Sequence, residues 1–442
     1  MAPAYDLMIR RGTLVNHDGR FEADIGVRDG RIVRIGHLQS ASAGEEIDAS
    51  GLHILPGVID TQVHLREPGM EHKEDLEAGG RAAVLGGVTA IFEMPNTKPP
   101  TINQESLEDK VRRATGRMQC DFAFYVGATE GNAKYLGELE RIPGCCGVKV
   151  FMGSSTGTLL VASDEGIAEV LRHIHRRAAF HSEDEYRLRE RLPMAELGNV
   201  ASHVVWRDEV TALHATERLL RLAREAGKQI HVLHVSTVEE IKVLSEHKDI
   251  ASVEVTPQHL TLAAPECYDD LGTLAKMNPP LRDARHQTGL WQGISSGVVD
   301  VIGTDHAPHT LEEKQKDYPD SPSGMPGVQT LLPIMLDHVN AGRLTLERLV
   351  DLTSYGAARL FRLPGRGHLA IGCDANFTLV DLAATRTIEN RWIASKCGWT
   401  PFAGKTVTGW PIGTIIRGRR VMFEDYIIGE PVGQPISFDQ TE

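Results

Sequence analysis

The sequence lacks any apolar run approaching the roughly 18 continuous apolar residues of a membrane-spanning helix. Its beginning, MAPAYDLMIR, also lacks a basic region followed by an apolar stretch of about 7–15 residues, which a secretory signal requires. Both absences argue against a membrane protein and a secreted protein. We therefore expect a cytoplasmic location.

Cysteine is scarce and scattered, with six residues in 442 and no Cys-x-x-Cys pair. This pattern indicates neither a structural zinc knot nor a disulfide framework, so we expect reduced thiols. The adjacent Cys145 and Cys146 raise the alternative of a nucleophile, but buried cysteines more commonly serve packing.

Basic residues are fewer than acidic ones. The chain has 47 Lys and Arg against 60 Asp and Glu, which gives a formal net charge of −13. Such a balance disfavours a nucleic-acid partner or an anionic membrane surface and favours a small-molecule substrate. A local basic pocket remains compatible with it. The chain is long enough for a barrel of about 250–300 residues and a smaller domain.

Both ends of the chain have the texture of short β-strands. Near the beginning, Asp29-Gly30 is typical of a hairpin turn. The expected strands are Tyr5–Val15, Ala23–Arg28 and Arg31–Gly36 at the beginning, and Ile371–Asp381 and Gly413–Phe423 at the end. We predict that residues 1–56 and 367–442 pair into one small β domain.

Between these ends, apolar strands alternate with amphipathic helices. One helix is expected over Glu74–Leu85 and another over Thr211–Ala226, which Gly227 would end. The eight expected strands are His53–Ile59, Val88–Met94, Cys120–Val126, Gly147–Met152, Ala178–His181, Gln229–His234, Ser252–Thr256 and Val298–Thr304. This alternation favours an α/β fold in which residues 57–366 form a (β/α)₈ TIM-type barrel, rather than an open doubly wound sheet.

The most informative stretch is Val301–His309, with Lys314 five residues further on. It is an apolar strand that ends on Asp305 and continues into a histidine-bearing loop. Parallel α/β barrels carry their chemistry at the carboxyl ends of their strands. Asp305 is therefore the first candidate for an active-site residue.

Three histidines also lie where predicted strands end, namely His64, His181 and His234. Each alone has an ordinary explanation as a surface or hydrogen-bonded residue. Together with Asp305 they supply the nitrogen and oxygen ligands that zinc prefers, so they predict a metal site. Three further histidines, His231, His259 and His306, are expected to be structural or to support the ligands.

Lys149 lies inside the apolar strand Gly147–Met152, where burial destabilises a charged ammonium group unless the charge is paired or lost. A neutral amine can react with carbon dioxide to form a carbamate, an anionic ligand with two oxygens that is able to bridge two metal ions. The alternative is a lysine whose ammonium group reaches water at the end of the strand.

These residues resemble the amidohydrolase superfamily and, within it, the dihydroorotases and their relatives that hydrolyse cyclic amides. The motifs that carry the resemblance are Leu55–Asp60, His64–Gly69, Glu93–Thr97, Lys149, His181, His231–Thr237, Asn278–Arg282 and Gly303–His309. The resemblance implies that His64, carboxylated Lys149, His181, His234 and Asp305 bind one or two zinc ions, and that Asp305 moves the proton. It also implies a homodimer or homotetramer.

One position departs from the family pattern, because the chain has Gln62-Val63-His64 where the family has His-x-His. A glutamine oxygen is a weaker zinc ligand than an imidazole nitrogen. A two-metal site, a single ion held mainly by Lys149, His181 and His234, and a paralogue with changed or lost activity that serves as a scaffold all stay open.

The resemblance implies hydrolysis of a cyclic amide, foremost the interconversion of dihydroorotate and carbamoyl aspartate in pyrimidine biosynthesis. A planar guanidinium at Arg66 suits the ring carboxylate of dihydroorotate, with help from Asn96 and His309. Allantoinases and hydantoinases, the alternatives, usually lack that arginine.

Two of these substrate contacts have competing explanations. Arg66 is also close in sequence to Glu67 and Glu71, either of which would give it an ordinary salt bridge. Asn278 either hydrogen-bonds the substrate ring or forms an Asn-Pro turn.

Overall fold

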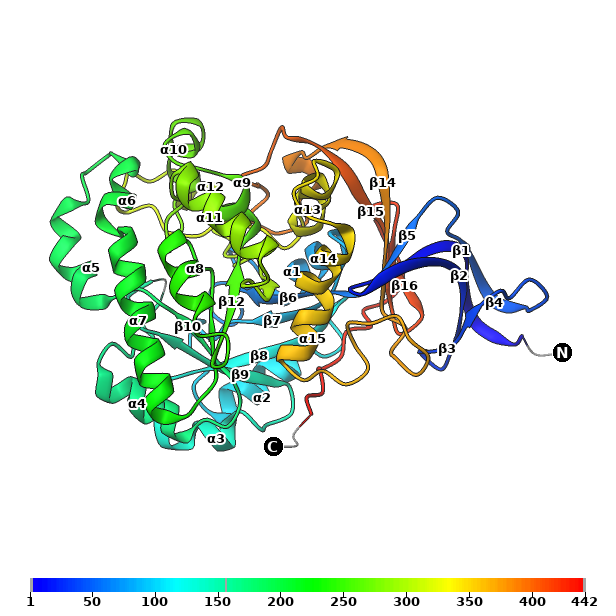
Figure 1. Cartoon of the computed structure of the whole chain (residues 1–442), viewed down its shortest axis with the longest axis horizontal. Helices are drawn as coiled ribbons and strands as arrows, with labels where there is room; N and C mark the ends of the chain where they lie inside the picture. Colours follow the sequence, from blue (N-terminus) through cyan, green and yellow to red (C-terminus); the bar gives the residue numbers. More distant parts are fainter. Residues whose placement is uncertain (1–2, 156, 440–442) are drawn as a thin grey trace.

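The computed structural model describes residues 3–155 and 157–439, which form two sheets and a surrounding layer of helices (Figure 1). One sheet has eight strands, all parallel, in the order of the sequence. The other has nine strands and is built from both ends of the chain, at one side of the barrel.

The parallel sheet is the predicted barrel. Its strands are β6 (Val58–Val63), β7 (Val88–Glu93), β8 (Asp121–Gly127), β9 (Cys145–Phe151), β10 (Ala178–His181), β11 (Ile230–Val232), β12 (Ala251–Val255) and β13 (Val301–Ile302). The first and last strands meet where Val63 bridges His306 and the His64 amide donates to the His306 carbonyl at 2.7 Å. The TIM-type barrel prediction is confirmed.

Helices cover the outside of the barrel (Figure 1). They are α1 (Leu76–Leu85), α2 (Gln104–Ala114), α3 (Leu136–Leu139), α4 (Asp164–His173), α5 (Glu185–Arg191), α6 (His203–Trp206), α7 (Glu209–Ala226), α8 (Val238–Ser245), α9 (Pro257–Thr261), α10 (Glu266–Leu271), α11 (Ala284–Ser295), α12 (Leu311–Lys314), α13 (Leu331–Asn340), α14 (Leu346–Val350) and α15 (Gly356–Leu360). A π-helical turn, Asp351–Tyr355, joins the last two. The long α7 begins where the Asp208 side chain accepts from the Thr211 amide and ends at Gly227, whose φ of 64° favours glycine.

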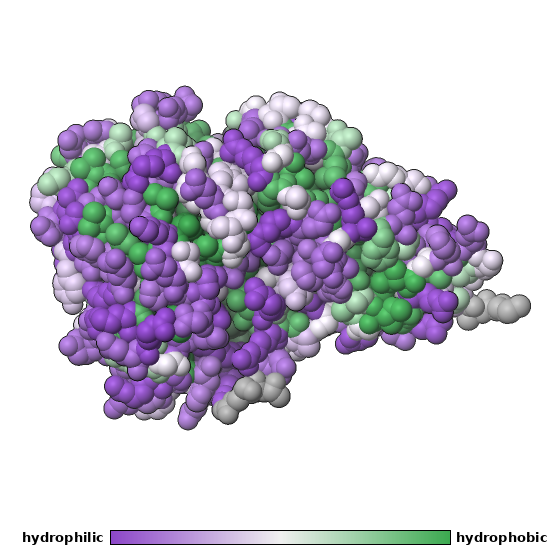
Figure 2. Space-filling model, in the orientation of Figure 1, coloured by the Kyte–Doolittle hydropathy of each residue, from purple (hydrophilic) through white to green (hydrophobic). Residues whose placement is uncertain are grey.

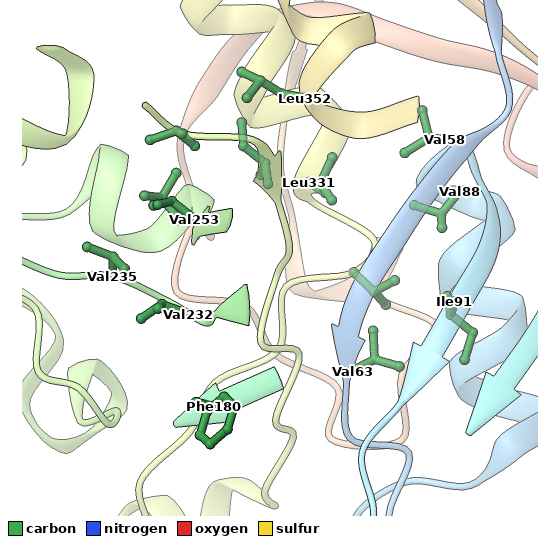
Figure 3. Close-up of a cluster of buried hydrophobic side chains, with 14 of the residues drawn as sticks. Val58, Val63, Val88, Ile91, Phe180, Val232, Val235, Val253, Leu331 and Leu352 are labelled. Carbon is green, nitrogen blue, oxygen red and sulfur yellow. The ribbon is translucent and has the colours of Figure 1, made fainter. Parts of the chain in front are cut away.

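The barrel strands are buried on both faces, which is why they read as continuous apolar runs rather than as alternating patterns. Figure 3 shows part of the resulting core, an extended cluster that includes Val63, Phe180 and Val253 of the barrel strands and Leu331 of α13. This packing anchors the barrel strands, and the candidate site residues follow their carboxyl ends.

The second sheet joins the two chain ends, as predicted. Its strands are β1 (Tyr5–Asn16), β2 (Gly19–Arg28), β3 (Arg31–Gly36), β4 (Ala43–Asp48), β5 (His53–Pro56), β14 (Phe377–Thr387), β15 (Thr406–Ile416), β16 (Arg419–Phe423) and β17 (Tyr426–Ile427). The junction is β5, which pairs parallel to β1 and antiparallel to β14.

Two predicted strands are each two strands in the structure. His53–Ile59 is divided between β5 of the small sheet and β6 of the barrel, because the chain passes from one sheet to the other at Gly57. No side chain fits there, since a Cβ at Gly57 would lie 2.3 Å from Thr89 Oγ1. The run Gly413–Phe423 is a hairpin that turns at Arg417-Gly418, with φ angles of 47° and 72°.

The eighth barrel strand is shorter than the predicted Val298–Thr304. Pairing stops after Ile302, because the Thr304 amide and hydroxyl both donate to the Asp60 carboxylate instead of continuing the ladder. This bond aims the next residue, Asp305, into the mouth of the barrel.

The last part of the chain does not stay with the small sheet. Residues 433–436 return to the barrel, where the Gly433 amide donates to the Met118 carbonyl and the Ile436 amide donates to the Phe122 carbonyl. Pro435 and Phe122 form a short parallel bridge there. The predicted domain limits at residues 56 and 367 stay a prediction.

The described helices include none that is both long and apolar enough to cross a membrane. The face of the molecule in Figure 2 is mainly hydrophilic, with hydrophobic residues gathered in separate patches.

Candidate active site

A pocket with an empty volume of about 350 Å³ opens at the carboxyl ends of the barrel strands, which we call the barrel mouth. Its walls are Gln62, His64, Arg66, Asn96, Lys149, Phe151, Ser155, His181, His234, Asn278, Asp305, Ala307, Ser323 and Gly324. All five predicted metal ligands and three of the four predicted substrate residues therefore line one pocket. The fourth, His309, lies behind Arg66.

His181 and His234 lie next to each other in the wall of the pocket. His181 Nδ1 lies 3.0 Å from His234 Nε2, and the other nitrogen of His181 lies 2.8 Å from a Glu183 oxygen. Burial lowers the pKa of both imidazoles, in His181 against the opposing effect of Glu183. Neutral rings with converging nitrogens are suited to bind a metal ion at a common point.

Lys149 differs from the other deeply buried lysines. Lys110 forms an ion pair with Glu93, and Lys314 donates to two backbone carbonyl groups, each at 2.9 Å. Within residues 3–155 and 157–439, Lys149 Nζ has no hydrogen bond or ion pair, and it lies over the Phe151 ring, 4.5 Å from the ring centroid.

The electrostatic consequence is a weakened ammonium group. Burial lowers the pKa of Lys149 to about 7, even though Asp305 and Glu254 act to raise it. A large share of this amine is therefore neutral at physiological pH, which is the form that reacts with carbon dioxide.

Asp305, His64 and Gln62 form a hydrogen-bonded group on the opposite wall. Asp305 Oδ1 lies 3.0 Å from His64 Nε2 and accepts from Gln62 Nε2 at the same distance. The second nitrogen of His64 lies 2.8 Å from Asn96 Oδ1. Burial lowers the pKa of His64 to about 4, so its imidazole is neutral at pH 7.

Gln62, the departure from the family pattern, keeps an oxygen available. Its Oε1 is buried and has no hydrogen-bond partner among the described residues, although buried polar atoms are normally paired. An oxygen in this state is suited to complete the shell of an ion.

Three pocket residues have left-handed backbone conformations that side chains rarely adopt. The φ angles are 64° at Arg66, 37° at His234 and 46° at Asp305. Each follows the end of a barrel strand, and such strain concentrates at functional sites because the surrounding structure must hold it in place. Here it turns the three side chains into the pocket.

Arg66 is almost fully buried, at 1% exposed, yet has no carboxylate partner among the described residues. Its Nε donates to the Pro308 carbonyl at 3.1 Å, and Nη2 lies 3.2 Å from His309 Nε2. Glu67 pairs with Arg117 instead, and Glu71 accepts from a backbone amide. The guanidinium edge that these contacts leave is available to an anion.

Burial also lowers the pKa of Arg66 to about 10, so the group keeps its charge at pH 7. Asn278, across the pocket, is fixed through both ends of its amide. Its Oδ1 lies 2.9 Å from His203 Nε2, and its Nδ2 donates to Ser155 Oγ at 3.3 Å.

The structure reveals a supporting pair that the sequence did not predict, Glu183 and Arg207. Both are buried, their closest atoms are 2.6 Å apart, and Glu183 fixes the orientation of His181. Burial raises the pKa of Glu183, but Arg207 and His181 outweigh it and hold the pKa below its usual range. The sequence signal that could have identified Glu183 was its position two residues after His181, the histidine that ends β10.

The three histidines expected to be structural all have protein partners. His231 Nδ1 lies 2.8 Å from Ser252 Oγ, and His259 Nδ1 lies 2.8 Å from Thr256 Oγ1. His306 Nδ1 accepts from the Gly327 amide at 3.0 Å. None of the three lines the pocket.

The donors of the mouth fit a divalent metal ion. Converging imidazole nitrogens, an unpaired glutamine oxygen, a carboxylate and a buried amine without a partner all face the same small space. Nitrogen and oxygen ligands of this kind suit zinc.

Comparisons with known proteins agree with this picture. Residues 53–421 match the amidohydrolase family. A dihydroorotase of Halobacterium salinarum is 37% identical over 92% of this chain and 96% of its own length. A dihydroorotase of Methanosarcina acetivorans is 34% identical over 96% of this chain and 94% of its own.

Among solved structures, an L-hydantoinase from Arthrobacter aurescens superposes with a TM-score of 0.94 at 30% identity, covering 98% of this chain and all of that one. Family match, full-length relatives and barrel architecture agree over nearly the whole sequence. The chain therefore belongs to the amidohydrolase family.

Proposed function

We propose that this protein is a metal-dependent cyclic amide hydrolase that interconverts dihydroorotate and N-carbamoyl-L-aspartate. The observation that carries the proposal is Lys149, a buried amine with no partner among the described residues, which lines one pocket with neutral imidazoles and Asp305. An apolar packing role does not explain it, since burying such a group unpaired is unfavourable.

The proposed ligands are His64, Lys149 in carboxylated form, His181, His234 and Asp305, with zinc as the expected ion. When bound, the metal lowers the pKa of its water toward about 7 and polarises the amide carbonyl of the substrate. Gln62 Oε1 offers one further oxygen, so the site suits one ion or two.

Asp305 is positioned to move the proton. Its Oδ1 is held by His64 and Gln62, whereas Oδ2 makes no hydrogen bond among the described residues. That oxygen is free to accept a proton from the attacking water and to deliver it to the ring nitrogen as the amide bond breaks. The reverse transfer closes the ring.

Arg66 gives the substrate its orientation. Its free guanidinium edge can bind the ring carboxylate through two parallel hydrogen bonds, and His309 holds the guanidinium from behind. Asn96 and Asn278 lie on the pocket wall, where their amides can hydrogen-bond the ring. This arrangement favours a cyclic amide that carries a carboxylate.

The second candidate is hydrolysis of a hydantoin or of allantoin. It is favoured by the likeness in fold to the L-hydantoinase, which is as extensive as the likeness in sequence to the dihydroorotases. Uncharged rings of that class leave the Arg66 guanidinium without a partner, a costly state for a buried charge.

The test is a substrate panel with metal analysis on the purified protein. We expect zinc to copurify, native intact mass to show one added carbon dioxide, and dihydroorotate to exceed dihydrouracil, hydantoin and allantoin by at least about 10²-fold in kcat/KM. Preference for an uncharged ring would favour the second candidate. Zinc-free protein without turnover of any substrate would favour a non-catalytic scaffold.

We also propose a homodimer or homotetramer in a reducing cytoplasm. The exposed apolar side chains Tyr186, Leu192, Met194, Leu197 and Val205 lie close together in sequence, around α5 and α6. Hydrophobic residues of this kind commonly mark contact surfaces. Light scattering after gel filtration measures the oligomeric state, and a monomer would contradict the assembly proposal.

A further inference from the structure

Two histidines and an aspartate also meet on the opposite side of the barrel from the mouth. His17 and Asp18 form the turn between β1 and β2, whereas His368 comes from the segment before β14. The group lies against Tyr355 of the π-helical turn, whose neighbour Gly356 packs on the backbone of Asp300, just before β13 begins. It is therefore at the amino ends of the barrel strands.

The chain holds these distant segments together by specific bonds. The Asn16 amide group donates to the Leu369 carbonyl and accepts from the Leu369 amide at 2.8 Å, across 353 positions of sequence. Gly367 sits so close to the π-helical turn that a Cβ would lie 3.0 Å from the Tyr355 Cα. His17 and His368, each next to one of these anchors, are thereby placed side by side.

The three side chains bring possible metal ligands together, and two of these have no hydrogen-bond partner among residues 3–155 and 157–439. One ligand atom from each of His17, Asp18 and His368 lies within 4.8 Å of the others. Nδ1 of His17 and Nδ1 of His368 are both buried without a hydrogen-bond partner among the described residues. His17 is further fixed by stacking on the Tyr355 ring, with centroids 3.5 Å apart and planes within 5°.

Buried imidazole nitrogens are normally paired, so two unpaired ones beside a carboxylate indicate a missing partner. A proton shared between the rings and Asp18 does not supply it, since no salt bridge joins Asp18 to either histidine in the part of the chain that the structure describes. An ion bonded at about 2.0–2.2 Å to two imidazole nitrogens and one carboxylate oxygen does. The exposed Asp18 can rotate to complete the set, and water can take a fourth position.

We propose that His17, Asp18 and His368 bind a divalent ion of the zinc class at a structural site separate from the barrel mouth. The ion ties the β1–β2 turn to the segment that leads into β14, and so holds both chain ends against the barrel. The inference does not depend on the proposed reaction.

The test compares metal content in the whole protein and in two variants of the site. Asp18→Asn keeps the shape of an exposed side chain and removes its charge, whereas His368→Gln removes an imidazole. We expect each variant to hold about one zinc ion fewer per chain than the unaltered protein, with turnover unchanged. Added Zn²⁺ should raise the Tm of zinc-stripped unaltered protein by about 2–4 °C more than that of either variant.

A matched control is His37→Gln, which removes an exposed histidine from the same small sheet region and should leave zinc content unchanged. Equal zinc content and equal Zn²⁺-dependent Tm shifts in all four proteins would overturn the proposal. Should His368→Gln fail to fold, Asp18→Asn decides alone. Loss of all zinc in the variants, with loss of turnover, would also count against a site independent of the mouth.

Discussion

Two fully buried charged residues on neighbouring barrel strands, one at each end of the barrel, differ in their partners. At the amino end, the fully buried Asp121 that begins β8 binds Arg417 at 2.6 Å and Arg366 at 2.5 Å, and accepts from the Gln434 amide. At the mouth, Lys149 in the neighbouring β9 is equally buried and has no partner in residues 3–155 and 157–439.

This difference separates stability from function. Asp121 connects the barrel to the small sheet through Arg417 and to residues 433–436 through the Gln434 amide. All of these contacts stabilise the fold. An unpaired buried amine such as Lys149 is unfavourable for folding, and the proposed metal site would account for it. The comparison therefore indicates a folding role for Asp121 and, under the proposed function, a chemical role for Lys149.

The largest expected effect comes from Lys149→Met, which keeps the length of the side chain and removes the amine. We expect kcat/KM to fall by at least about 10³-fold, equivalent to roughly 4 kcal/mol of transition-state stabilisation. Zinc content should fall with it. In zinc-stripped protein, Tm should stay equal or rise, because an unfavourable buried amine is gone. Steady-state kinetics, metal analysis and thermal unfolding measure the three.

Lys314→Met is the matched control, since that lysine is equally buried but donates to backbone carbonyl groups. Its loss should lower Tm and leave zinc content unchanged. If Lys149→Met kept full turnover, the assignment of chemistry to this residue would be wrong.

At the other end, Asp121→Asn should produce the opposite result. Two guanidinium groups would lose their shared carboxylate, so we expect the free energy of unfolding to fall by about 3 kcal/mol. The kcat of the folded fraction should stay within about twofold of the unaltered protein. Urea unfolding and an active-site titration separate these quantities, and a large loss of kcat without a loss of stability would break the comparison.

The sequence predicted those features of the fold and of the pocket that follow from strand order and from patterns within single segments. Parallel strands bring their carboxyl ends to one place, so residues such as His181 and Asp305 could be grouped without knowing any contact. The pairing of the chain ends followed in the same way from two similar β-rich textures.

What the sequence did not predict depends on contacts between distant segments. The left-handed backbone at His234 is imposed by the surrounding fold rather than by its own side chain. The division of His53–Ile59 into two strands depends on close packing at Gly57. The meeting of His17 with His368 could not be seen from residues more than 350 positions apart.

Arg66→Lys sharpens the comparison within the mouth, because it keeps the charge but removes the planar fork. We expect kcat/KM for dihydroorotate to fall by about 10²-fold, or roughly 2.7 kcal/mol, since a bidentate contact becomes a single one. Turnover of dihydrouracil, which has no carboxylate, should change far less. The same kinetic panel measures both.

Zinc content serves as the control for Arg66→Lys and should be unchanged. An equal loss for dihydroorotate and dihydrouracil would show that the arginine supports the pocket rather than the carboxylate. Unaltered kinetics with both would contradict the substrate assignment.

The smallest expected effect is at Glu183, where Glu183→Gln keeps a hydrogen-bond acceptor for His181 Nε2 and removes the charge that pairs with Arg207. Partners that orient a metal-binding histidine typically contribute about 10–100-fold to activity. Because the acceptor is retained, we expect kcat/KM of this variant to fall by about 10-fold.

Glu140→Gln is the matched control at the amino end of the barrel, where the buried Glu140 carboxylate accepts from the His175 and Arg176 amides. It should change stability but not kcat, and equal kinetic losses in the two variants would show that the two ends of the barrel do not differ in this way.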